Sequence, residues 1–154
     1  MLRPIIATAL LALGAVPAAA SGNLLCSVED ETFTINLEGI FSHGLGEALT
    51  EAKGEIGIKA DLGPLATGLA GKPLALPDVK QFWMYGQELK VRLYRDSEGE
   101  AQGSLEIVIE TAREGDDETA FAGTYTASVR RVDPKTGAEE ESVSARGPIA
   151  CSAG

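Results

Sequence analysis

The stretches ELKVRLYR at residues 88–95 and SLEIVIET at residues 104–111 decide the fold class of this chain. In the first, Leu89, Val91 and Leu93 alternate with charged residues, and the second repeats the pattern. Alternation with a period of two is typical of β-strands that bury one face. The sequence therefore predicts antiparallel β structure with an apolar interior.

Other parts of the chain carry the same alternation. The further runs are Thr119–Val132, Glu141–Cys151, Thr32–Glu38 and Ile56–Leu62. The C-terminal runs are separated by short segments rich in glycine, proline and acidic residues, at 96–102, 114–118 and 133–137. Loops this short cannot cross over a sheet, so neighbouring runs should pair in sequence as a meander.

The N-terminal half contains one change of phase and one ambiguous segment. Leu24, Cys26 and Val28 have the opposite parity to the run that begins at Phe33, so we expect a bulge or break near Asp30. Residues 47–53 fit one turn of helix or a strand; we favour the strand, with residues 43–46 as the turn before it.

The chain has two cysteines, Cys26 and Cys151, at opposite ends of this β region. They lack the C-x-x-C spacing of redox or metal-binding pairs, and an oxidising compartment would join them. We therefore predict one disulfide that brings the first and last strands together.

These observations predict an all-β fold: six to eight antiparallel strands in an up-and-down meander that forms a closed or nearly closed barrel. Closure would remove the exposed strand edges beside the two cysteines. A β-sandwich is the alternative, because both architectures share the period-two pattern.

Residues 1–20 have the pattern of a cleavable signal peptide. Arg3 precedes an apolar run at residues 5–16, and Pro17 precedes small residues that suit cleavage after Ala20. The run is shorter than the roughly 20 residues of a spanning helix. We expect a Sec-type signal, a periplasmic or secreted bacterial protein without a stable membrane anchor, and a single domain over residues 21–154.

The mature chain would be strongly acidic. It keeps 12 of the 13 basic residues and all 23 acidic ones, a net charge of −11. This balance argues against nucleic acids and anionic lipids, which are bound by clustered lysine and arginine. It suits solubility or the attraction of a basic partner such as a cationic enzyme.

Residues 63–87 differ from the rest, with Pro64, Pro73 and Pro77 and little charge. A helical turn could follow Pro64, where proline suits the first helical position. We expect the connection to fold over an open end of the sheet with Trp83 in the core. The alternative is a binding loop, for which the candidate ligand-binding residues are Phe82, Trp83, Met84 and Tyr85.

No motif for catalysis, cofactor binding or metal binding is present. His43 is the one histidine, too few for a common zinc site, and no G-x-S-x-G elbow supplies a nucleophile for it. The acidic segment at residues 114–118 lacks EF-hand spacing and reads as a hairpin tip. Acidic pairs for glycoside hydrolysis are too numerous for one to be singled out.

We therefore expect a non-enzymatic, monomeric binding module whose partner is a small apolar ligand or an envelope protein. The alternatives are an inhibitor of a cationic envelope enzyme and, less favoured, a small secreted hydrolase. In build alone, the chain resembles periplasmic inhibitors of lysozyme and metalloproteases and small lipocalin-like carriers. A carrier should contain an apolar cavity, an inhibitor a filled core, and a hydrolase a polar cleft.

Overall fold

The structure, a computed structural model, describes residues 20–98 and 101–154. The predicted signal peptide lies outside the described residues, apart from Ala20. No helix within the described part has the length and apolar character that a membrane crossing requires. The strands are β1 (Ser21–Glu29), β2 (Phe33–Ser42), β3 (Ala48–Ile58), β4 (Leu74–Ala75), β5 (Val79–Tyr85), β6 (Glu88–Asp96), β7 (Gly103–Arg113), β8 (Ala120–Val132) and β9 (Glu139–Ala153).

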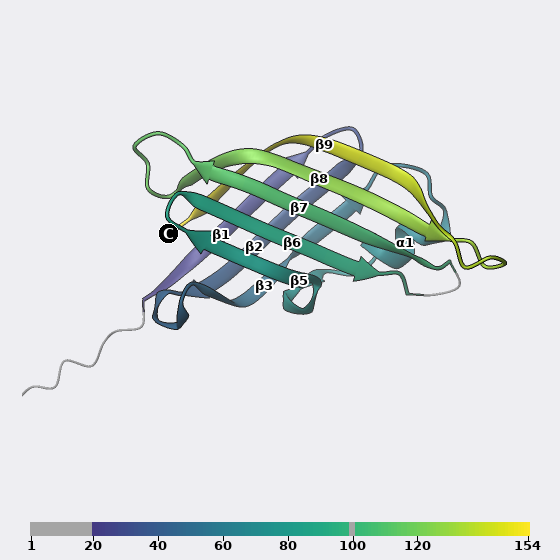
Figure 1. Ribbon diagram of the computed structural model, residues 1–154, viewed down its shortest axis with the longest axis horizontal. Helices are drawn as coiled ribbons and strands as arrows, with labels where there is room; N and C mark the ends of the chain where they lie inside the picture. The colour runs from purple at the N-terminus through teal and green to yellow at the C-terminus, as the bar shows by residue number, and fades with distance from the viewer. Residues whose placement is uncertain (1–19, 99–100) are drawn as a thin grey trace, which may run out of the picture.

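The strands form one antiparallel sheet in the order β4-β3-β2-β1-β9-β8-β7-β6-β5 (Figure 1). The first and last strands pair with each other, so the sheet curls into a nearly closed barrel and the sandwich alternative is wrong. The hydrogen-bonded ladder ends at β4 on one side and at β5 on the other, and it is interrupted between these two strands. Because neighbours alternate in direction and nine strands are present, these two end strands run the same way, and an antiparallel ladder cannot close between them.

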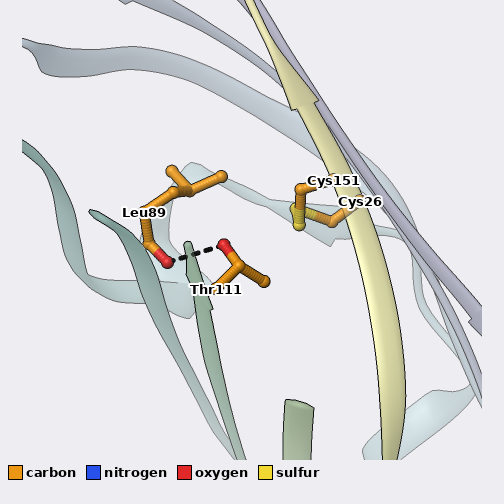
Figure 2. Close-up of a disulfide and its surroundings, with 4 residues drawn as sticks. All are labelled: Cys26, Leu89, Thr111 and Cys151. Carbon is orange, nitrogen blue, oxygen red and sulfur yellow. Dashed lines mark hydrogen bonds between the residues drawn. A yellow bond between two sulfur atoms is a disulfide. The ribbon is translucent and has the colours of Figure 1, made fainter. Parts of the chain in front are cut away.

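The predicted disulfide is present and lies in the middle of the β1–β9 pairing. Cys26 and Cys151 are direct register partners with their Cα atoms 4.1 Å apart. Figure 2 shows the bridge pointing into the barrel, toward the side where Thr111 and Leu89 lie. There the buried Thr111 hydroxyl donates a 2.8 Å hydrogen bond to the Leu89 carbonyl, so this polar core group is satisfied.

The interior of the barrel is filled by the alternating side chains that the sequence predicts. Leu89, Val91 and Leu93 on β6 are buried, as are the inward residues of β2 and β7. The largest aromatic side chains in the core are those of Phe33, Phe41, Phe121 and Tyr125, and none is more than 2 % exposed. Close packing of this kind leaves the inward faces of the strands no room for a large ligand.

The phase change near Asp30 is a tight hairpin turn between β1 and β2. The Asp30 carboxylate accepts hydrogen bonds from the backbone N–H groups of Thr32 and Phe33, at 2.7 and 2.8 Å. The predicted turn before β3 is also confirmed: it contains the 3₁₀ helix η1 (His43–Leu45), and the ambiguous segment that follows is strand.

Residues 63–87 hold more regular structure than the sequence indicated. Helix α1 (Pro64–Ala70) begins at the predicted proline, and Leu65 and Leu69 on it are fully buried at one end of the barrel (Figure 1). After β4, a 3₁₀ helix η2 (Leu76–Asp78) leads into β5. The prediction of six to eight strands is therefore wrong, because this segment adds two and the total is nine.

Candidate binding surface on strand β5

The four candidate ligand-binding residues all lie on β5, but on two different faces. Phe82 and Met84 point inward and pack against the core, whereas Trp83 and Tyr85 point outward. Trp83 is 54 % exposed and Tyr85 is 76 % exposed. The expectation that Trp83 belongs to the core is therefore wrong: its position on β5 directs it to the outer face.

The inward residues of β5 hold the strand against the barrel. The ring of Phe82 lies 6.0 Å from that of Phe41 on β2, at a tilt of 34°. This aromatic contact connects β2 with β5, across the side of the barrel where the hydrogen-bonded ladder is interrupted. Phe82 thus acts as a packing residue that sets the position of the exposed pair.

The outward residues form what we call the β5 aromatic surface: Gln81, Trp83, Tyr85 and Lys90. The Trp83 and Tyr85 rings lie 6.0 Å apart at a tilt of 55°. Lys90 on β6 is the register partner of Trp83. A surface hollow of about 580 Å³ runs beside Trp83 over the outer face of β5, β6 and β7. The surface therefore offers two adjacent aromatic rings bordered by polar and charged side chains.

Lys90 of this surface and its neighbour Arg92 already have acidic partners. Arg92 Nε lies 2.6 Å from Glu106 Oε1, and Lys90 Nζ lies 3.3 Å from Glu88 Oε1. Both pairs are substantially exposed, so they contribute little to stability. They leave a surface of nearly balanced charge in an otherwise acidic protein.

A buried arginine anchors the segment that leads into β5. Arg95 on β6 is 4 % exposed and donates to Asp78, at 3.1 Å from Nε and 2.6 Å from Nη2. Its remaining donors reach the carbonyls of Leu69, Lys72 and Pro73, at 2.9 to 3.0 Å. The Arg95 side chain thus satisfies carbonyl groups both at the end of α1 and in the segment between α1 and η2.

Asp78 completes this anchor. Burial opposes ionisation of its carboxyl, but hydrogen bonds from Arg95 and from the Ala75 N–H outweigh burial and lower its pKa. Sequence reasoning missed the pair, although the sequence contained a signal. Arg95 continues the inward parity of Leu93, and a charged residue at an inward position needs a buried partner.

The other residues that the sequence analysis singled out lie elsewhere. His43 lies in η1, at the end of the barrel opposite α1 (Figure 1). The acidic segment at residues 114–118 forms the connection between β7 and β8. Within residues 20–98 and 101–154, no three His, Cys, Asp or Glu side chains are grouped so as to hold a metal ion.

Comparison with known proteins gives no relative from which a function could be transferred. No family model, no curated protein sequence and no solved structure matches this chain.

Proposed function

We propose that this protein is an extracytoplasmic binding domain that recognises another protein through the β5 aromatic surface. The observation that carries the proposal is the exposure of Trp83 and Tyr85 side by side on one strand of a barrel with a filled interior. Large aromatic side chains are usually buried, so a pair of them left in water suggests a contact surface.

The packing of the core argues against a carrier of apolar ligands. Inward side chains from both halves of the sheet, such as Ile35, Ile107 and Tyr125, are fully buried against one another. Hollows of about 320 to 640 Å³ in the described part of the chain open on the outer face or at one end of the barrel. A binding function is therefore better placed on the outside of the barrel.

The chemistry of the surface favours a protein partner. Tryptophan and tyrosine are enriched among the residues that dominate protein interfaces, usually in the centre of a polar rim. Trp83 and Tyr85 supply the apolar centre, and Gln81 and Lys90 supply part of the rim. The net charge of −11 expected for residues 21–154 would accelerate encounter with a basic partner.

Site-directed photo-cross-linking can identify the partner. A photoreactive residue at Gln81 leaves Trp83 intact and should cross-link one envelope protein. The same residue at Leu25, which is 52 % exposed on the outer face of β1, is the matched control and should not capture it. Equal capture from both positions would contradict the proposed surface.

Affinity for the purified partner then tests the role of the aromatic pair. Trp83→Ala should weaken binding by about 30-fold, as expected of a residue that dominates an interface. Leu25→Ala should leave the affinity unchanged. Unchanged binding by Trp83→Ala, or a shift of Trp83 fluorescence with fatty acids or polyprenols but with no protein, would overturn the proposal.

A further inference from the structure

The last strand, β9, is much longer than the ladder that joins it to β1. It covers Glu139–Ala153, but β1 pairs with it only over residues 150–153. On its other side β9 pairs with β8 over residues 139–152, and the turn between these two strands lies at the far right of Figure 1. In the described part of the chain, residues 139–149 of β9 therefore have a strand on one side only.

Hydrogen bonds at the end of β9 show which backbone groups face this free edge. The Ala153 N–H donates to a carbonyl just before β8, at 2.9 Å, whereas Gly154 exchanges bonds of 2.8 and 3.1 Å with Asn23 of β1. Successive residues of a strand direct their N–H and C=O groups to opposite sides. Because the register with β8 is continuous over residues 143–152, the even-numbered residues of this stretch direct theirs away from β8. Pro148 fits this rule, since a proline has no N–H to give to the β8 ladder.

The backbone at this edge is open to another extended chain. Within residues 20–98 and 101–154, no backbone group outside β8 forms a hydrogen bond with the backbone of residues 139–149. Ser144, near the middle of the edge, is exposed, and its neighbours Val143 and Ala145 are partly buried against the core. Strand edges with unpaired N–H and C=O groups are the usual places where a second chain adds to a sheet.

Charges of opposite sign lie on the two sides of Ser144 along this edge. Arg146 follows it, and Glu140 and Glu141 precede it; all three are exposed. In the part of the chain that the structure describes, none of the three takes part in an ion pair. Glutamates on a strand edge repel most added strands, so a strand that pairs here must bring a positive charge to them.

We infer that the free edge of β9 pairs with the same edge of a second copy of this chain, which gives a two-fold symmetric dimer. The two strands run antiparallel about an axis at Ser144, whose N–H and C=O groups bond to those of Ser144 in the other copy. The inference replaces the monomer expected from the sequence, and it does not depend on the β5 aromatic surface.

This arrangement makes the edge complementary to itself. Positions equally distant from Ser144 on its two sides become neighbours, so Val143 of each copy lies opposite Ala145 of the other. Arg146 of each copy lies within one or two positions of Glu140 and Glu141 of the other. A parallel arrangement in the same register would place glutamates beside glutamates, at a cost in binding free energy. The charge pattern therefore selects the antiparallel pair.

Charge reversal on the two sides of Ser144 tests the dimer. In sedimentation equilibrium at about 100 μM, the mature protein should have twice the monomer mass. Arg146→Glu should weaken association by at least about 50-fold, and so should the double variant Glu140→Arg, Glu141→Arg. An equimolar mixture of these two variants should form a heterodimer, because each then meets the opposite charge. A monomeric wild type, or a mixture that stays monomeric, would overturn the inference.

A backbone variant and two controls locate the contact. Ser144→Pro removes the N–H at the centre of the pairing, and it should be monomeric with the circular dichroism spectrum of the wild type. Glu51→Arg, at an exposed position on β3, and Trp83→Ala should remain dimeric. A folded, dimeric Ser144→Pro protein, or loss of the dimer in Trp83→Ala, would contradict pairing through β9. If Ser144→Pro does not fold, the mixture of charge-reversed variants decides.

Discussion

Tyr125, near the middle of β8, donates a hydrogen bond from its phenol to the carboxylate of Asp30, 95 residues earlier in the chain. Tyr125 is fully buried, and Asp30 lies in the turn that joins β1 to β2. Because the same carboxylate accepts hydrogen bonds from two backbone N–H groups of that turn, the bond ties the N-terminal hairpin to β8, which only β9 separates from β1 in the sheet.

Removal of this phenol should destabilise the protein without disturbing its packing. Tyr125→Phe keeps the buried ring but withdraws a hydrogen bond from a charged acceptor. The free energy of unfolding should fall by about 1.5–3 kcal/mol, measured by urea denaturation. Tyr94→Phe is the matched control, since the Tyr94 hydroxyl donates to Asp96 at 2.7 Å in an exposed position. Its effect should stay within about 0.5 kcal/mol, and similar losses in the two variants would contradict a special role for Tyr125.

The same pair predicts the pH dependence of stability. The bond from Tyr125 and those from the Phe33 and Thr32 N–H groups lower the pKa of Asp30. The contribution of Asp30 to the free energy of unfolding is therefore present above the pKa of about 3.9 in the unfolded chain. It is lost as the pH falls through the lower pKa of the folded state. Asp30→Asn should flatten the acid side of a plot of unfolding free energy against pH. A variant curve parallel to wild type below pH 4 would contradict this.

At alkaline pH, the contribution of Tyr125 to stability is lost as the pH rises. Burial first, and then the bond to Asp30, raise the pKa of Tyr125. The contribution of Tyr125 is complete below the unfolded pKa of about 10 and is lost as the pH rises toward the higher folded value. Tyr125→Phe should therefore lose less stability than wild type above about pH 10. The measurement is urea unfolding across the alkaline range, and identical slopes would count against the assignment.

Arg95 should be much harder to replace than Arg92, a half-buried arginine on the outer face of the same strand. Arg95→Lys cannot form the five hydrogen bonds to Asp78 and the three carbonyls, and it leaves the Asp78 charge partly buried. A loss of about 3–5 kcal/mol is expected, with faster hydrogen exchange in residues 64–78. Arg92→Lys, which alters the exposed pair with Glu106, should cost no more than about 1 kcal/mol. Equal losses would contradict the anchoring role.

The disulfide should stabilise the folded protein, because it closes a long loop. Cys26 and Cys151 are 125 residues apart, which corresponds to about 5 kcal/mol in the chain-entropy treatment. The Cys26→Ser, Cys151→Ser double variant should retain the β-sheet circular dichroism spectrum but unfold at a lower urea concentration. A change below about 1 kcal/mol would mean that the β1–β9 ladder alone holds the ends together.

Much of the fold could be predicted because one-sided burial leaves a period-two pattern in the sequence. The runs around Leu89, Ile107 and Val129 mark their strands and inward faces correctly. The cysteines at the two ends predict the contact between β1 and β9. Strand β5 was missed because its outward residues include Trp83 and Tyr85, so it has no contrast between polar and apolar positions. A register irregularity between Val79 and Gln81 disturbs its alternation further.

The candidate sites could be predicted only in part. Residues 82–85 were recognised as unusual, but their division between the core and the outer face depends on the register of β5 against β6. The Arg95–Asp78 pair was not predicted, because the two residues become neighbours only after the barrel has formed.

The sequence by itself determined the β class, the inward face of most strands and the pairing of the two cysteines, since these follow from local alternation and from composition. The tertiary structure alone decided that the barrel stays open between β4 and β5, that Trp83 lies in solvent, that Asp30 pairs with Tyr125 and that Arg95 pairs with Asp78. These features depend on which distant strands become neighbours. Strand pairing of that kind is set by the summed burial of the whole core, and no single segment encodes it.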